Sequence, residues 1–288
     1  MRLALPYPTM TFLSFYAARE QGFLAAEGVD LEILHVAGGG HAIMEMFMKG
    51  EVDFLFAHWE MVEIAMRGKL DVRALCGSIA DPYSFFVRPE IKTFADLKGK
   101  NVMVGPMGSG SNTEARYCLM QAGVDPAEVN FVVGDYLKRI LALQDPNIHA
   151  MQDRTQTWYW AQKAGWRYLK LADPDLFLDN GGLSTTLKLI REQPEIVGKV
   201  VKAVVQATRF IQEDREGAIA LSRKVIPYLS DEEIRGSYEV LRPHFDAEVR
   251  PATIQFIQEA IGTVMGIPQR LDFEELVDLR FLRQAQAG

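Results

Sequence analysis

The chain has 288 residues, of which 48% are hydrophobic and 24% charged, and its formal net charge is −7 at pH 7. This length suits one large or two medium domains of an ordinary globular protein. The negative charge argues against nucleic acid or an anionic membrane as the main partner, and no apolar stretch has the ~20 residues that a membrane helix needs.

The first 80 residues alternate short β-like runs with amphipathic helical stretches. Runs at 3–7, 29–37 and 52–58 are each followed by a helical stretch, and a further run occupies 72–80. This alternation predicts a parallel sheet with crossover helices. Open sheets of this kind bind ligands at the carboxyl edge, where each strand turns into a helix, so we expect the functional residues in those turns.

The pattern restarts near residue 101, with a helix expected over 111–122, and the chain becomes almost wholly helical from about residue 194. Two similar α/β units in succession predict two lobes, with the helical tail packed back on the first. No low-complexity linker separates the parts, so we expect short crossings at 81–87 and 179–187. Lobe 1 is expected to comprise 1–84 and 182–288, and lobe 2 to comprise 85–181.

The turn GPMGSGSNTEA at 105–115 resembles three known motifs without satisfying any of them. It lacks the Lys of a phosphate loop, has its glycines in the wrong order for dinucleotide binding, and lacks the central Ser of a nucleophile elbow. Ser111 followed by Glu114 fits a capping box. The preceding backbone N–H groups point either to a ligand loop at a helix N-terminus or to a capped turn that binds nothing. The segment alone leaves both open.

Four segments, taken in order, carry a family resemblance: 17–34, 38–54, 94–105 and 190–211. They resemble the substrate-binding proteins of ABC importers for sulfonates, nitrate, taurine and thiamine precursors, a family that includes the thiamine-pyrimidine-synthase-like proteins. The resemblance covers essentially the whole chain. It implies the type II periplasmic-binding-protein fold, with two α/β lobes, a two-strand hinge and a ligand held in the cleft. The turn at 105–115 would then be the ligand loop of lobe 2.

The strand-to-helix turns supply the candidate ligand-binding residues. They are Tyr7, Thr9, Phe12, Gly39, His41, His58, Trp59, Glu60, Tyr83, Gly108, Ser109, Gly110, Ser111, Asn112, Gln152, Arg154 and Trp158.

The chemistry of these candidates leaves alternatives open. His58 is a ligand contact, a satisfied polar group, or, with Glu60, a proton-transfer pair. Arg154 is placed either to bind a carboxylate or sulfonate with two hydrogen bonds or to form a surface ion pair. The aromatic side chains of Tyr7, Trp59, Tyr83 and Trp158 suit either ring stacking or the core.

Neither special chemistry of the resembled family is expected here. Its desulfinase branch uses a cysteine in the first strand-to-helix loop, but that loop at 6–15 contains none. Its thiamine-pyrimidine synthases have a cysteine-rich motif and a lysine that holds pyridoxal phosphate, and no cysteine cluster occurs here. Cys76, Cys118 and the five histidines match no metal-ligand spacing. We therefore expect no cofactor and no metal.

Two functions follow as expectations. The first is a monomeric solute-binding protein that captures a small organic ligand, anionic or aromatic, and delivers it to an ABC transporter permease. The second is a cytoplasmic enzyme on the same fold, such as a decarboxylase or another lyase or hydrolase of an aromatic acid, using His58, Glu60 and Arg154. Met1 and Arg2 lead directly into a short apolar run. We thus expect a periplasmic or extracytoplasmic protein if a signal peptide was removed, and otherwise a cytoplasmic one.

Overall fold

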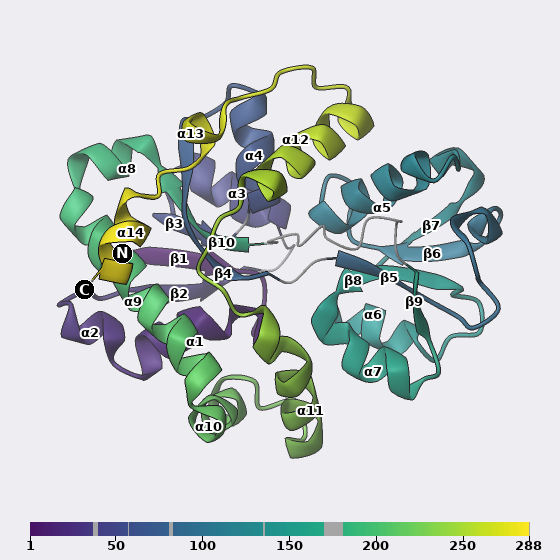
Figure 1. Ribbon diagram of the computed structural model, residues 1–288, viewed down its shortest axis with the longest axis horizontal. Helices are drawn as coiled ribbons and strands as arrows, with labels where there is room; N and C mark the ends of the chain where they lie inside the picture. The colour runs from purple at the N-terminus through teal and green to yellow at the C-terminus, as the bar shows by residue number, and fades with distance from the viewer. Residues whose placement is uncertain (37–39, 57, 81–82, 135, 170–180, 288) are drawn as a thin grey trace.

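The computed structural model describes residues 1–36, 40–56, 58–80, 83–134, 136–169 and 181–287. Its two α/β lobes lie side by side (Figure 1). The sheet order shows that the chain changes lobe between β4 and β5 and again between β9 and β10. Residues 81–82 and 170–180, between these strands, lie outside the described residues. None of the helices in the described ranges is long and apolar enough to cross a membrane.

Lobe 1 is built on a five-stranded sheet in the order β2-β1-β3-β10-β4. The strands are β1 (Arg2–Leu5), β2 (Glu32–His35), β3 (Phe54–Phe56), β4 (Val72–Ile79) and β10 (Gly181–Thr186). Its first helices are α1 (Leu13–Glu20), α2 (Phe23–Ala26), α3 (Gly40–Met48) and α4 (His58–Met66), and a 3-10 turn, η1 (Met10–Phe12), precedes α1.

Lobe 2 repeats the arrangement with the strand order β7-β6-β8-β5-β9. The strands are β5 (Tyr83–Val87), β6 (Asn101–Val104), β7 (Asn130–Val133), β8 (Ala150–Arg154) and β9 (Arg167–Leu169). Its helices are α5 (Gly110–Gln121), α6 (Tyr136–Ala142) and α7 (Trp158–Lys163), with 3-10 turns η2 (Phe94–Leu97), η3 (Pro126–Glu128) and η4 (Thr155–Thr157).

The two-lobe α/β fold confirms the prediction, but both sheets are mixed rather than parallel. Strand β10 runs antiparallel to β3 and β4, and β5 runs antiparallel to β8 and β9. These are the strands by which the chain enters each lobe from the other. Because such a strand enters its sheet at the carboxyl edge, it must run against the strands that end there. The reversal therefore indicates that the two carboxyl edges face each other.

The tail consists of helices connected by short segments. They are α8 (Leu187–Glu192), α9 (Pro194–Glu213), α10 (Arg215–Val225), α11 (Asp231–Leu241), the 3-10 turn η5 (Arg242–His244), α12 (Pro251–Met265), α13 (Phe273–Leu276) and α14 (Arg280–Ala287). Helix α9 packs on α1 through a buried stripe at helical spacing that includes Val197, Val200, Val201 and Val204.

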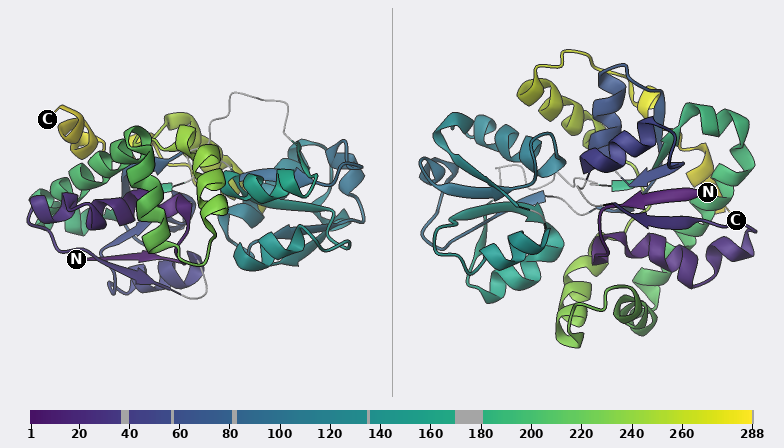
Figure 2. Two further views of the ribbon diagram at one scale, coloured as in Figure 1. Left: turned by 90° about the horizontal axis from the view of Figure 1, so that it is seen from below. Right: turned by 180° about the vertical axis from the view of Figure 1, so that it is seen from behind.

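The tail also reaches lobe 2. Helix α12 contacts α4 of lobe 1 and α5 of lobe 2, and α11 contacts α7 and η4. Figure 2 shows the tail and both lobes from two further directions. The packing on lobe 1 is as expected, whereas the contacts with lobe 2 are an addition that hydrophobic periodicity does not reveal.

Candidate functional site

Residues from the strand-to-helix turns of both lobes meet where the two sheets face each other. Gln156 Oε1 in η4 accepts hydrogen bonds from the backbone N–H of Thr11 at 3.3 Å and from its hydroxyl at 3.0 Å. The guanidinium carbon of Arg154 lies 5.6 Å from the ring centroid of Phe56. We call this region, where the turn after β1 and the end of β3 meet the end of β8 and the turn that follows it, the interlobe site.

The end of β8 presents two different faces because side chains alternate along a strand. Asp153 faces α6, where its Oδ1 accepts a hydrogen bond from Arg139 Nη1 at 2.7 Å and its Oδ2 accepts one from Thr157 at 2.7 Å. Gln152 and Arg154 lie on the other face, towards α5. There the Gln152 amide donates a hydrogen bond to Glu114 Oε1 at 3.3 Å. Glu114, Gln152 and Arg154 are called the Glu114 cluster below.

Glu114 is the least expected member of this cluster. Its residue is 2% exposed, and burial raises the pKa of its carboxyl well above the usual range, although the charge of Arg154 and the hydrogen bond from Gln152 act in the opposite direction. Burial of a carboxyl without full compensation favours the neutral acid. The cluster therefore combines a guanidinium with a carboxyl that is biased towards its uncharged form.

The capping-box interpretation of Ser111 and Glu114 is wrong. Helix α5 begins at Gly110, and its N-cap is Ser109, two residues before the expected cap; the Ser109 hydroxyl accepts a 3.4 Å hydrogen bond from Asn112 N. Glu114 instead lies one helical turn before the buried Cys118, on the face of α5 that packs against the sheet. That i, i+4 spacing from an inward-facing residue is the sequence signal that could have identified a buried carboxyl.

The turn at 105–109 is held by side chains from the first turn of α5. Ser111 Oγ accepts a hydrogen bond from Gly105 N at 3.0 Å, and the Asn112 amide donates one to Gly105 O at 3.1 Å. A Cβ at Gly105 would lie 2.5 Å from Ser109 Oγ and 2.6 Å from Ser111 Oγ, so a larger residue here would displace both hydroxyls. Ser111 and Asn112 are buried and Gly108 and Ser109 are half-buried, whereas Pro106 and Met107 are the exposed part of the turn.

On lobe 1, Thr9 and Phe12 are buried beside Thr11, and Tyr7 is half-buried. The Phe12 and Phe56 rings meet edge to face with centroids 4.8 Å apart. The interlobe site therefore brings two buried aromatic rings next to the guanidinium of Arg154.

His58 and Trp59, at the start of α4, lie in the packed interior of lobe 1. His58 is 0% exposed and hydrogen-bonds the backbone of Cys76, and burial lowers its pKa to about 4. Trp59 is 5% exposed and packs edge to face on Phe256 of α12, with centroids 6.1 Å apart. Glu60 is half-buried, and its carboxylate lies so close to Gly40 that a Cβ there would be 2.2 Å away. The expected roles of His58 and Glu60 in ligand contact or proton transfer stay predictions.

The remaining candidates divide between other locations. Trp158 lies on the α7 side of lobe 2, away from the face that carries the Glu114 cluster. Its ring is stacked on Phe86, with centroids 5.9 Å apart, and tilted against Tyr168, with centroids 4.1 Å apart. Gly110 is the first residue of α5, and His41 is the second residue of α3. Tyr83 begins β5 and pairs with Arg154 in the sheet. Gly39 lies outside the described residues.

Two further bridges join the tail to lobe 2. The ring of Phe256 also meets Tyr117 of α5, with centroids 5.3 Å apart, and the Tyr117 hydroxyl donates a 2.6 Å hydrogen bond to Glu259. On the α11 side, Trp160 Nε1 donates to Glu233 Oε1 at 3.0 Å. The tail therefore contacts lobe 2 at two places, through α12 and through α11, in addition to the contact between the lobes at the interlobe site.

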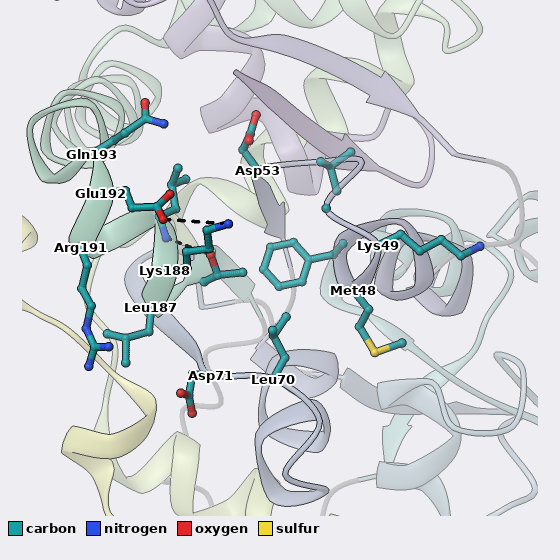
Figure 3. Close-up of a pocket in the computed structure, with 15 residues that line it drawn as sticks. Met48, Lys49, Asp53, Leu70, Asp71, Leu187, Lys188, Arg191, Glu192 and Gln193 are labelled. Atoms are coloured by element: carbon teal, nitrogen blue, oxygen red, sulfur yellow. Dashed lines mark hydrogen bonds and ion pairs between the residues drawn. The ribbon is translucent and has the colours of Figure 1, made fainter.

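A separate hollow of about 720 Å³ lies on lobe 1, among Lys49, Asp53, Asp71, Lys188 and Arg191 (Figure 3). It borders the starts of β3 and β4 and the end of the antiparallel β10, which is the amino edge of the sheet. It is thus at the end of the sheet opposite to the interlobe site, and none of the candidate residues lines it.

Both cysteines are buried, Cys76 on β4 and Cys118 on α5, and burial raises the pKa of the Cys118 thiol. Across the described ranges no three His, Cys, Asp or Glu side chains come together as a metal site. Neither thiol lies in the first strand-to-helix turn.

The chain was compared with known proteins. The family model described as NMT1/THI5 like matches residues 9–218. A search of curated protein sequences found no match.

Solved structures resemble the whole chain. A protein from Bordetella bronchiseptica RB50 superposes with a TM-score of 0.82 at 20% identity, covering 99% of this chain and 96% of that one. The alkanesulfonate-binding protein SsuA from Xanthomonas axonopodis pv. citri, solved bound to MOPS, gives 0.77 at 16% identity, covering 97% and 98%. The desulfurization enzyme DSZB gives 0.70 at 16% identity, covering 99% of both chains. At these identities the likeness establishes a common fold, which binding proteins and an enzyme share.

Proposed function

This chain belongs to the NMT1/THI5-like family, and from that premise we propose that it is a solute-binding protein that closes its two lobes on a small organic anion for ABC-type import. Binding proteins of this fold include one named for alkanesulfonates. The observation that carries the proposal is the meeting of Arg154 of lobe 2 with Phe56 of lobe 1. A ligand bound beside this contact touches both lobes at once.

The proposed mechanism is hinge closure. A ligand shifts the balance between open and closed forms only by its extra affinity for the closed form, which here comes from contacts with both lobes. The guanidinium of Arg154 is suited to bind a carboxylate or sulfonate with two parallel hydrogen bonds. Phe12 and Phe56 supply apolar edges on the opposite lobe, and Tyr7, Thr9, Gly108 and Ser109 lie in adjoining turns.

Binding is favoured over catalysis by the surroundings of His58. A histidine with a pKa near 4 that is buried in the core is neutral at pH 7 and has no exposed surface from which to exchange a proton with a ligand. We accordingly propose a monomeric extracytoplasmic protein that delivers its ligand to a membrane permease. Product formation from an added aromatic carboxylic acid would reverse this preference in favour of the enzyme.

The direct test is a thermal-shift titration with MOPS and with benzoate, which carry a sulfonate and a carboxylate. Saturating ligand is expected to raise the melting temperature by several degrees. Arg154→Met should abolish most of that rise, whereas Arg283→Met, an equal loss of charge on the exposed face of α14, should preserve it. An undiminished rise in Arg154→Met contradicts the assigned role of Arg154.

A further inference from the structure

Glu114, on α5, lies against Gln152, which shares a face of β8 with Arg154. The Glu114 carboxyl accepts a hydrogen bond from Gln152, and the two residues are almost fully buried, at 2% and 1% exposed. A carboxylate facing an arginine is ordinarily its ion-pair partner, and such a pair would have no net charge left for an anionic ligand. The charge state of Glu114 therefore determines which ligands the site accepts.

The surroundings of Glu114 favour the neutral acid. The ionisable groups that interact with it are Arg154 of β8 and Cys118 of its own helix, and Gln152 adds one hydrogen bond. The carboxyl of Glu259, on the adjacent α12, is engaged by Tyr117 instead. Desolvation is the largest influence on the Glu114 pKa and exceeds the opposing effect of Arg154.

The hydrogen-bond geometry agrees with this. An ionised carboxylate offers about four acceptor positions and needs several donors when it is buried. Among the described residues, Glu114 Oε1 receives one hydrogen bond, from Gln152, and the buried Oε2 receives none. Gln152 Oε1 is also buried without a hydrogen bond in the same part of the structure. A protonated Oε2 needs fewer donors, so the sparse set present fits the acid better than the anion.

We propose that Glu114 is a specificity-determining residue of the interlobe site, held as a neutral carboxylic acid so that the charge of Arg154 serves a ligand with a single anionic group. This rests on the proposed function, since it assumes that the ligand binds at Arg154. It selects a sulfonate or a carboxylate over its uncharged analogue. A Glu114 that formed a structural ion pair would instead neutralise the positive charge of Arg154.

The charge state can be tested without a ligand. The infrared difference spectrum between the wild type and Glu114→Gln is expected to contain the carbonyl-stretching band of a protonated carboxylic acid at pH 7. Glu128→Gln, which removes an exposed carboxylate of lobe 2 paired with Lys98, should give carboxylate bands alone. Carboxylate bands from Glu114→Gln as well would overturn the proposal.

The ligand half is tested by titrating benzoate against benzamide, an uncharged analogue of similar shape. Glutamine mimics the neutral acid, so Glu114→Gln should bind benzoate within about threefold of the wild type and keep its preference over benzamide. If Glu114 is instead the ionised partner of Arg154, the same variant should bind benzoate at least about tenfold more tightly. That gain would refute the inference.

The two proposals fail in different ways. If neither benzoate nor MOPS binds to the wild type, the proposed function fails and the specificity role of Glu114 fails with it, while the infrared measurement still decides its charge. If Arg154→Met retains benzoate binding, the ligand does not bind at this cluster and the inference is overturned even though solute binding stands.

Discussion

Gln156 of lobe 2 holds Thr11 of lobe 1 by two hydrogen bonds to a single oxygen, one from the Thr11 backbone and one from its hydroxyl. Both residues are buried, at 2% and 0% exposed. The contact thus fixes the distance between two strand-to-helix turns that belong to different sheets.

Thr11→Val should weaken this link while keeping the shape of the side chain. Loss of one buried hydrogen bond is expected to lower the free energy of unfolding by about 1 kcal/mol, since the amide oxygen of Gln156 then keeps only the backbone donor. Urea denaturation measures the change. Thr263→Val, on an exposed position of α12, is the matched control and should leave the value nearly unaltered. Equal effects of the two substitutions would contradict a stabilising role for the Thr11 hydroxyl.

Tyr117→Phe should loosen lobe 2 from the tail. It removes the hydroxyl that donates to Glu259 but keeps the ring that packs on Phe256, at a cost of about 1–2 kcal/mol. Small-angle X-ray scattering of the unliganded protein should show a larger radius of gyration as the open form gains population. In Tyr228→Phe, the hydroxyl lost bonds to Pro8 within lobe 1, so no expansion is expected. A radius unchanged in Tyr117→Phe would argue that α12 does not hold the lobes together.

His58 should make the protein sensitive to acid. Its folded pKa of about 4 lies below the unfolded value of 6.5, so the unfolded state binds more protons between these values. Stability from this group is therefore complete above pH 6.5 and is lost as the pH falls towards 4, by about 3 kcal/mol in total.

The check is the free energy of unfolding measured from pH 7 to pH 4 in the wild type and in His58→Gln. The variant should lose less stability over this range than the wild type does. His244→Gln, on the tail, should retain the full acid sensitivity of the wild type. Parallel pH profiles for the wild type and His58→Gln would show that His58 is not the source of that sensitivity.

Gly182→Ala should be severely destabilising. A Cβ at this position of β10 would lie 2.0 Å from the carbonyl oxygen of Cys76 and 2.6 Å from Gly77 Cα, both in the backbone of β4. Backbone atoms within a sheet cannot move aside cheaply, so a loss of about 3 kcal/mol or more is expected. Gly198→Ala, in the interior of α9 with its nearest contact at 3.4 Å, should be neutral or stabilising because alanine favours helix. Calorimetry compares the two.

The alternation of β-like and helical segments was sufficient to predict two α/β lobes and a helical tail. The local pattern did not predict the antiparallel direction of β5 and β10, since that direction results from how the chain crosses between lobes. For the same reason, residues of η1 and η4 that are 145 positions apart could be placed near their sheet edges but not paired with each other.

The sequence did not predict which side chains of the strand-to-helix turns point towards the interlobe site and which point into the core. His58 follows a strand in the expected turn, yet its ring lies inside lobe 1, because the first turn of α4 packs against the core and Cys76. Glu114 was attributed to a capping box because Ser-x-x-Glu fits one, whereas the N-cap is Ser109, two residues before Ser111, and the Glu114 carboxyl is buried. Moving the N-cap by two residues changes the angular position of each side chain relative to the cap by about 200°. Such a shift exchanges a solvent-facing residue for a buried one.

The rings of Trp59, Phe256 and Tyr117 connect lobe 1, the tail and lobe 2. Residues that do not touch the ligand can therefore influence its affinity. The apparent dissociation constant equals the intrinsic one divided by the fraction of molecules already in the competent form. Substitutions along α12 that alter that fraction would therefore strengthen or weaken capture of every ligand by the same factor. Under the proposed function, affinity is therefore adjusted through the tail, independently of the selectivity that the residues of the interlobe site provide.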